Sequence, residues 1–276
     1  MSLSLTDFRY ICDLVLDRSA IVLEPGKEYL VESRLTPLAR REGVGGLDEL
    51  IARLRQRTVN GLETRVVEAM TTNETSFFRD LHPFNALHKT ILPDLLERRS
   101  SERTLGIWSA AASSGQEIYS IAMLLREHFP QLAGWKVRLL ATDLSDEMVQ
   151  RASEGLFSQL EVNRGLPAPL LLKYFEKQGA QWRINDEIRT SIEFRRMNLV
   201  EPWPQIPDMD VIFIRNVLIY FSVESKRDIL AKVRQVLRRD GALFMGAAET
   251  TFSLDDSFER VQIEKTSCYR PRGGAG

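Results

Sequence analysis

The chain has 276 residues, of which 43% are hydrophobic and 27% charged, and its 37 basic and 38 acidic residues leave a net charge of −1. The hydrophobic share suffices for a buried core and excludes a chain that is disordered throughout. The near-neutral charge excludes binding to nucleic acid or anionic lipid through the field of the whole protein.

Residues 1–70 show the spacing of amphipathic helices, without β-type alternation. Thr6 is the expected N-cap of the first helix, because apolar residues recur at helical spacing after it. A second helix is expected over residues 27–41, and Pro37 should either kink it or start a new helix. Two further amphipathic stretches complete a predicted all-α N-terminal domain, at residues 47–56 and 61–70.

Beyond about residue 88, short apolar strands alternate with amphipathic helices. This alternation predicts an α/β domain with a parallel sheet and helices on both faces, a Rossmann-like fold. We expect residues 71–88 to be an interdomain linker and residues 89–276 to be this domain. The expected strands span residues 105–108, 137–141, 192–197, 211–214 and 242–246, and the expected helices span residues 118–127, 146–154 and 223–237.

One stretch does not fit the alternation. Trp182 and Ile184 alternate with polar residues up to Asn185-Asp186, and Ile188 follows. We interpret this as a hairpin with its turn at Asn185-Asp186. It predicts a small antiparallel β-subdomain inserted at about residues 160–192.

The two cysteines, Cys12 and Cys268, form neither a disulfide framework nor a zinc site, and they favour a reducing compartment. The N-terminus has no signal-peptide pattern, and no apolar run approaches the roughly 18 residues that span a bilayer. We therefore expect a cytoplasmic protein that does not insert into membranes.

The loop after the first expected strand, residues 109–117, is rich in small side chains that let a ligand approach the backbone. It matches neither a dinucleotide fingerprint nor a P-loop, and a plain tight turn explains it equally well. Residues 111–115 loosely match a hydrolase nucleophile motif, but that fold needs a histidine after the last strands. No histidine lies there, and no third ligand completes a metal site; the three histidines are His82, His88 and His128.

Polar residues also end the later strands, on the edge where Rossmann-like sheets bind ligands. Asp143 ends the second strand and could accept hydrogen bonds from two ribose hydroxyls, although a helix cap beside Ser145 explains it as well. Asn198 ends the third strand, and Arg215 and Asn216 end the fourth. Four polar strand ends without a phosphate-binding loop predict a site for a nucleoside with few phosphates, which S-adenosylmethionine fits.

Four longer segments carry a resemblance: TTNETSFFRD at residues 71–80, IWSAAASSGQEIYSIA at 107–122, ATD at 141–143 and IRNVLIYF at 214–221. In this order they resemble the CheR-type chemotaxis receptor methyltransferases, and the resemblance covers nearly the whole chain. That family transfers methyl groups from S-adenosylmethionine to glutamates on the cytoplasmic helices of chemoreceptors. The resemblance implies a protein-glutamate O-methyltransferase of sensory adaptation, with S-adenosylhomocysteine as product.

The resemblance also implies roles for single residues. Glu117 and Asp143 would take the amino-acid and ribose groups of the cofactor. Further cofactor contacts are implied for Asn73, Thr75, Arg79, Asn198, Leu199, Arg215 and Asn216.

A glutamate acceptor has a reference pKa of about 4.3 and is ionised at neutral pH, so no general base is needed. Catalysis would depend on alignment and on removing water from the carboxylate. Arg79 and Tyr220 are the expected catalytic residues, which orient the carboxylate or the methyl donor. Tyr220 could instead be a packed aromatic beside Phe221.

Residues 33–57 contain six arginines and three acids, a local charge of +3. Such a run is commonly a solvated helical face, but arginine pairs well with the carboxylates of an acidic receptor helix. The expected docking residues are Arg34, Arg40, Arg41, Arg53, Arg55 and Arg57.

Two other functions also fit the sequence: a methyltransferase of this fold that acts on another protein or a small acid, and a cofactor sensor without catalysis. The joint presence of Arg79, Asp143, Asn216 and Tyr220 argues against the sensor. We expect a monomer that binds receptor helices and no nucleic acid. It should not depend on a receptor C-terminal pentapeptide, because the segment at residues 176–182 is short and has one glycine.

Overall fold

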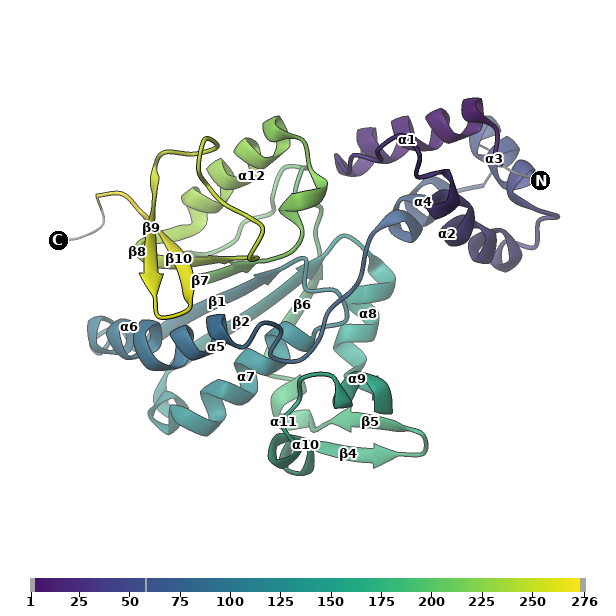
Figure 1. Ribbon diagram of the computed structural model, residues 1–276. Helices are drawn as coiled ribbons and strands as arrows, with labels where there is room; N and C mark the ends of the chain where they lie inside the picture. The colour runs from purple at the N-terminus through teal and green to yellow at the C-terminus, as the bar shows by residue number, and fades with distance from the viewer. Residues whose placement is uncertain (1–2, 58, 274–276) are drawn as a thin grey trace. The chain divides into compact units, whose positions relative to one another are not determined.

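The computed structural model describes residues 3–57 and 59–273. The chain divides into two compact units (Figure 1). The first comprises Met1–Thr72 and Tyr220–Ser225, and the second comprises Asn73–Ile219 and Lys226–Gly276. Within the described residues, no helix is both long and apolar enough to span a bilayer.

The first unit is all-α, as predicted, and Ser4 rather than Thr6 caps its first helix. The Ser4 hydroxyl accepts a hydrogen bond from the Asp7 N–H at 3.1 Å, so the helix begins before Thr6 and includes it. The helices are α1 (Leu5–Ser19), α2 (Glu28–Arg41), α3 (Leu47–Gln56) and α4 (Leu62–Met70).

Helix α2 continues through Pro37 as one element, so no new helix starts there. Proline in a helix interior costs about 3 kcal/mol, because it removes one backbone hydrogen bond and crowds the preceding turn. Burial of Leu35 and Leu38 on the same helix offsets this cost, since both side chains lie in the core of the unit.

The second unit contains a seven-stranded sheet in the order β6-β2-β1-β7-β8-β10-β9. The five predicted strands are present and parallel. They are β1 (Thr104–Ala110), β2 (Lys136–Asp143), β6 (Ile192–Arg196), β7 (Met209–Ile214) and β8 (Leu237–Met245). An antiparallel hairpin that the sequence analysis missed, β9 (Phe258–Ile263) and β10 (Thr266–Pro271), extends the sheet beyond β8.

Helices cover both faces of this sheet; Figure 1 shows α6 and α7 on one side and α12 on the other. The helices are α5 (His82–Ala86), α6 (Leu92–Arg98), α7 (Gln116–His128), α8 (Asp146–Glu154) and α12 (Val223–Val236). A π-helical turn, η1 (Leu87–Ile91), joins α5 to α6, and two 3-10 turns are η2 (Pro130–Gly134) and η3 (Leu218–Tyr220).

The predicted β-subdomain is present as a three-stranded antiparallel sheet in the order β3-β5-β4. The predicted place of its turn was wrong: β4 and β5 pair around Gly179-Ala180, where Gly179 has a φ of +60°. Asn185 instead caps a short helix, because its side chain accepts the Ile188 N–H at 3.2 Å. The elements are β3 (Leu156–Ser158), α9 (Gln159–Asn163), α10 (Ala168–Tyr174), β4 (Phe175–Gln178), β5 (Gln181–Ile184) and α11 (Asp186–Arg189).

Candidate active site

Asp143 lies at the carboxyl end of β2 and holds two loops together. One carboxylate oxygen accepts the Ser113 N–H at 2.8 Å, and the other accepts the Ser145 N–H at 3.0 Å. The cap of α8 is the Ser145 hydroxyl, which accepts the Met148 N–H at 3.2 Å. Asp143 is therefore more than a helix cap, and the carboxylate, with two lone pairs on each oxygen, can also accept hydrogen bonds from ribose hydroxyls.

Burial of Asp143 raises the pKa of its carboxyl above the ordinary value of 3.8, while the backbone N–H groups that it accepts act in the opposite direction. The residue is only 7% exposed. A buried carboxylate loses hydration that hydrogen-bond donors must replace. Two ribose hydroxyls would supply such donors, so this site fits the ribose of a nucleoside.

Arg215, directly after β7, is bonded to two acidic side chains from different loops of the second unit. Its guanidinium donates to Glu117 at 2.8 Å and to the Asp80 carboxylate at 2.7 Å, and its side chain is only 2% exposed. The carbonyl of Arg79 accepts a further bond from it at 3.0 Å. The other Glu117 oxygen accepts the Ser109 hydroxyl at 2.8 Å.

The Nε atom of Arg215 is buried and finds no acceptor within residues 3–57 and 59–273. A buried donor without a partner is costly, but the Nε atoms of Arg238 and Arg270 also lack an acceptor, so this property alone does not mark a ligand site. Arg215 directly follows β7, whose neighbours in the sheet are β1 and β8. Its guanidinium therefore lies at the ligand-binding edge and fits a polar group of a cofactor. Asp80 was missed in the sequence analysis, although its place directly after Arg79 was the available signal.

The segment before α5 also lies at this edge. The Ser113 hydroxyl donates to the Asn73 carbonyl at 3.0 Å, and Arg79 donates to the Glu74 carbonyl at 2.7 Å. The half-buried Thr75 lies between these anchored positions in the chain. The structure thus brings the 73–79 segment, the 109–117 loop and the end of β7 to one edge of the second unit.

Backbone strain is concentrated in the same loops. Of the 11 non-glycine residues with positive φ in the described chain, six lie at this edge. Such conformations cost free energy and persist where the surroundings hold them, most often at functional sites. The six are Phe78, Asp80, Leu81, Ala111, Ser113 and Asn216.

Asn198 and Leu199 follow β6 on the other side of Asp143. The Asn198 amide donates to Glu201 at 3.0 Å, and its oxygen accepts the Val200 N–H at 3.3 Å, so it shapes its own loop. Both Asn198 and Leu199 are buried. The Asp143 carbonyl accepts the N–H of the preceding residue, Met197, at 2.8 Å, and this bond joins the chain after β6 to the end of β2.

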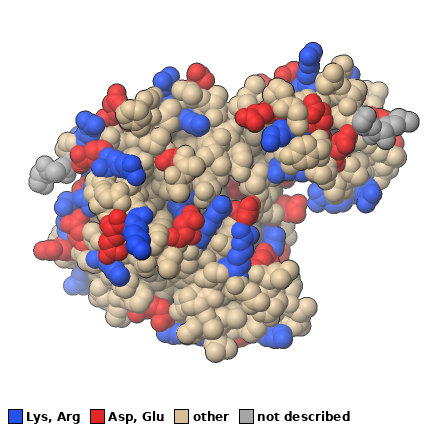
Figure 2. Space-filling model, viewed as in Figure 1, with Lys and Arg blue, Asp and Glu red and all other residues tan. Residues whose placement is uncertain are grey.

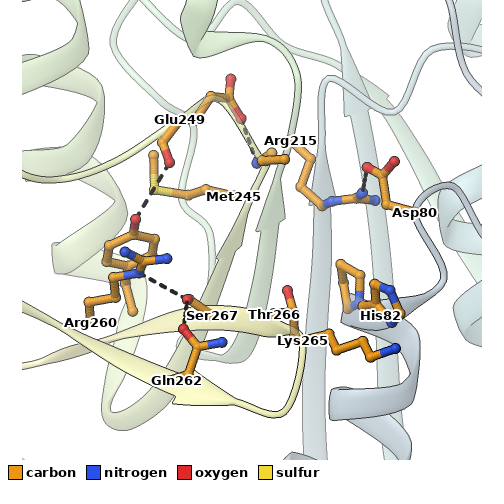
Figure 3. A pocket seen from close by; sticks show the side chains of 14 residues that line it. Asp80, His82, Arg215, Met245, Glu249, Arg260, Gln262, Lys265, Thr266 and Ser267 are labelled. Carbon is orange, nitrogen blue, oxygen red and sulfur yellow. Dashed lines mark hydrogen bonds and ion pairs between the residues drawn. The ribbon is translucent and has the colours of Figure 1, made fainter.

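A cavity of about 270 Å³ lies beside Arg215, between the end of β8, the start of α5 and the β9–β10 hairpin (Figure 3). Its walls carry both signs of charge, including Asp80, Arg260 and Lys265. Glu249, in the loop after β8, also lines it, and no sequence signal had singled that residue out.

Tyr220 belongs to the first unit, and its carbonyl accepts the Val22 N–H at 2.9 Å.

Arg34, a residue of the predicted docking set, donates hydrogen bonds to three consecutive residues. Its acceptors are the Met70 carbonyl, the Thr71 carbonyl at 3.0 Å and the Thr72 hydroxyl at 2.9 Å. Arg34 thereby holds the end of α4, and its burial lowers the pKa of its guanidinium.

Three other arginines of the predicted docking set have acidic partners within the first unit. Arg53 pairs with Glu49 at 2.6 Å, Arg55 with Asp7 at 2.8 Å and Arg57 with Glu63 at 3.6 Å. Arg40 and Arg41 are exposed near the end of α2. On the face shown in Figure 2, basic and acidic side chains are interspersed.

Comparisons with known proteins show the family of this chain. The all-alpha domain of CheR methyltransferases matches residues 6–71, and the SAM binding domain of CheR methyltransferases matches residues 73–267. The chain is 40% identical over 277 aligned positions to chemotaxis protein methyltransferase 1 of Pseudomonas aeruginosa, covering 99% of this chain and 100% of that relative.

Two further relatives are more distant. Chemotaxis protein methyltransferase 1 of Vibrio cholerae is 35% identical over 273 positions, covering 98% of each chain. The chemotaxis protein methyltransferase of Salmonella typhimurium is 34% identical over 263 positions, covering 94% of this chain and 88% of that relative. The chain therefore belongs to the CheR family of S-adenosylmethionine-dependent chemotaxis protein methyltransferases.

Proposed function

We propose that this protein esterifies glutamate side chains on the cytoplasmic helices of chemoreceptors, with its cofactor held along the carboxyl edge of the second unit. The observation that carries the proposal is the buried Asp143 carboxylate at the end of β2, on the same edge of the sheet as the Arg215–Glu117 pair. Asp143 would hold the ribose, and Glu117 with Arg215 would hold the amino-acid end. The loops at Asn198, Leu199 and Asn216 would enclose the adenosine.

S-adenosylmethionine, when bound, supplies a methyl group on a positively charged sulfur. The acceptor carboxylate provides the electron pair for the new O–CH₃ bond, and the C–S bond breaks with its electrons left on sulfur. The products are a neutral ester and a neutral thioether, and no proton is transferred. No side chain is therefore needed as a general base, and alignment is what the protein supplies.

Arg79 and Tyr220 are the proposed orienting residues. Within the described residues, the only hydrogen bond that the Arg79 side chain makes is from one terminal nitrogen to the Glu74 carbonyl. Its remaining N–H groups can orient a carboxylate of the cofactor or of the acceptor. The Tyr220 hydroxyl would orient the reacting groups by a single hydrogen bond.

Receptor docking through the first unit is a further part of the proposal. Arg40 and Arg41 are the best candidates, because both are exposed, whereas Arg34 holds the end of α4. Arg53, Arg55 and Arg57 would have to exchange their present acidic partners for receptor carboxylates.

The proposed enzyme is monomeric and cytoplasmic, and it works without a pentapeptide tether. The short β4–β5 hairpin, with four residues in each strand, supports the last point, because it offers little edge on which a peptide could pair.

Transfer of radiolabelled methyl groups to receptor-containing membranes tests the proposal. We expect incorporation into the receptor that mild base releases as methanol, because carboxyl methyl esters hydrolyse readily and N-methyl groups do not. An Asp143→Ala enzyme is the control for cofactor-dependent transfer. Base-stable label, or transfer to soluble small acids in place of receptor, would contradict the proposed acceptor.

A further inference from the structure

The loop between β7 and α12 is held by one buried side chain from another part of the second unit. Glu249 is 9% exposed and lies in the loop after β8 (Figure 3). Its carboxylate accepts five backbone N–H groups at distances of 2.6–3.3 Å. The donors are the N–H groups of Gly246, Asn216, Val217, Leu218 and Ile219.

Four of these donors are consecutive and belong to the loop at residues 216–219. The 3-10 turn η3 starts at Leu218, and the first N–H groups of a helical turn have no partner within it. Glu249 supplies that partner from 33 residues along the chain from Asn216. A carboxylate only accepts hydrogen bonds, so it suits a set of converging N–H groups.

Gly246 allows this arrangement because it has no side chain. A Cβ atom there would lie 2.7 Å from the Glu249 oxygen and 2.9 Å from both the backbone nitrogen and the amide nitrogen of Asn216. Asn216 itself has a φ of +58°, a conformation that needs support in a residue other than glycine. Three residues from two strand ends therefore fix one another.

We infer that Glu249 is a positioning residue for methyl transfer: its carboxylate fixes the 216–219 loop and thereby the place of the Asn216 amide at the cofactor edge. This inference rests on the proposed placement of the cofactor along that edge. Glu249 acts through Asn216, and no contact between Glu249 and the reacting atoms is required.

Charge as well as shape matters in this arrangement. Glutamine has nearly the same size as glutamate, but its amide nitrogen would face N–H groups that need an acceptor. Because each Glu249 oxygen accepts at least two N–H groups, either orientation of a glutamine leaves donors opposed to donors. Aspartate keeps the charge on a shorter side chain and should retain part of the function.

Calorimetric titration with S-adenosylhomocysteine, together with thermal unfolding, tests the inference. We expect Glu249→Gln to weaken binding at least tenfold and Glu249→Asp to recover part of the loss, at a temperature where both variants are folded. Glu259→Gln, on an exposed residue of β9, is the matched control and should bind within twofold of the wild type.

A pair of glycine variants separates positioning from stability. Gly246→Ala should weaken binding, because it displaces Glu249 or Asn216. Gly241→Ala, on β8, meets Leu237 at 2.7 Å and the Asp210 carbonyl at 2.8 Å, so it should lower the melting temperature without changing affinity. These two variants also test the inference if the Glu249 variants fail to fold.

Wild-type affinity for S-adenosylhomocysteine in Glu249→Gln or in Gly246→Ala, despite a lowered melting temperature, would overturn the inference and leave the proposed function intact. A wild-type protein that does not bind S-adenosylhomocysteine would contradict the proposed function itself. The two failures are therefore distinguishable in one set of titrations.

Discussion

Two buried arginines at opposite ends of the same sheet have different surroundings. Arg99 precedes β1 at the amino edge and donates from Nε to Asp210 at 2.8 Å, while both of its terminal nitrogens bond to Asp240 at 2.9 and 2.5 Å. Asp210 also accepts the Gly106 N–H at 2.8 Å. Arg215, at the carboxyl edge, bonds through its terminal nitrogens and has an Nε without an acceptor in the described chain.

The two arginines therefore differ in how completely their guanidinium groups are paired. Every nitrogen of the Arg99 guanidinium has an acceptor, so Arg99 needs no ligand and its ion pairs serve the fold, although the buried Nε of the neighbouring Arg238, 3.6 Å from Asp210, has no hydrogen-bond acceptor in the described chain. Arg215 is also buried, but its Nε has no acceptor in the described chain, and its neighbours Asp80 and Asn216 have positive φ angles. Ligands of open α/β sheets bind at the carboxyl edge, where Arg215 lies. We therefore expect variants at the amino edge to lower the stability of the fold and variants at the carboxyl edge to weaken cofactor binding.

The largest expected effect is on stability. Arg99→Met removes the 2.8 Å guanidinium partner of Asp210, which is 1% exposed, and leaves it only the more distant Arg238 at 3.6 Å; breaking a buried ion pair costs about 3–5 kcal/mol. Urea unfolding measures this loss. Arg98→Met is the matched control, because Arg98 is more exposed and its pair with Asp94 contributes about 1 kcal/mol or less. Equal losses in the two variants would show that the amino edge does not depend on Arg99.

The second largest effect is expected for Asp143→Ala, on the affinity for S-adenosylhomocysteine. Losing two hydrogen bonds to a ribose should cost roughly 1–3 kcal/mol in binding of S-adenosylhomocysteine, which is about 5- to 150-fold in Kd. Asp146→Ala, at an exposed position three residues further on, should leave the affinity unchanged. Calorimetry that finds wild-type affinity in Asp143→Ala would remove Asp143 from the cofactor site.

Tyr220→Phe tests the chemistry and keeps the ring. If its hydroxyl orients the reacting groups, kcat should fall about tenfold, since one such hydrogen bond contributes roughly 1–3 kcal/mol, while cofactor affinity should stay the same. Initial rates of receptor methylation measure this change. A fully active Tyr220→Phe enzyme would make Tyr220 a packing residue.

The pH dependence of cofactor binding is the smallest effect near neutrality. Because burial raises the pKa of Asp143 above 3.8, affinity should fall with decreasing pH before that value is reached, as the carboxylate is protonated. Protonation of Asp143 at acidic pH has the opposite effect on the stability of the fold. A raised folded-state pKa stabilises the fold below the unfolded-state value, and this contribution is lost as the pH rises through the folded-state pKa.

Titration of S-adenosylhomocysteine as a function of pH, in wild type and in Asp143→Asn, measures this dependence. The wild type should lose affinity at acidic pH, and the variant should show a weaker dependence at lower overall affinity. The same acidic loss in both proteins would assign the titration to a group other than Asp143.

Local sequence patterns predicted most of the fold. The strands of the parallel sheet and the helix at residues 146–154 are confirmed, because apolar periodicity acts within a few residues. The hairpin turn predicted at Asn185 was wrong, because asparagine favours both turns and helix N-caps and the sequence pattern does not distinguish the two. Ser4 and Thr6 are likewise both good cap residues, and only the hydrogen bond to Asp7 distinguishes them.

The site was predictable to the extent that it follows strand ends. Asp143 and Arg215 could be found in this way, because each lies at the end of an apolar strand. Asp80 lies beside a predicted site residue, but its bond to Arg215 spans 135 residues and no local pattern predicts it. Glu249 had no local signal, since its role comes from contacts with a loop about 30 residues away in the chain. The β9–β10 hairpin was missed because its place is set by pairing with β8.

The most direct test of the difference between the two edges is a side-by-side titration of Arg99→Met and Arg215→Met with S-adenosylhomocysteine, at a temperature where both proteins are folded. We predict wild-type affinity in Arg99→Met and at least tenfold weaker binding in Arg215→Met. Weakened binding in Arg99→Met, or unchanged binding in Arg215→Met, would contradict the assignment of the carboxyl edge to the cofactor and of the amino edge to the fold.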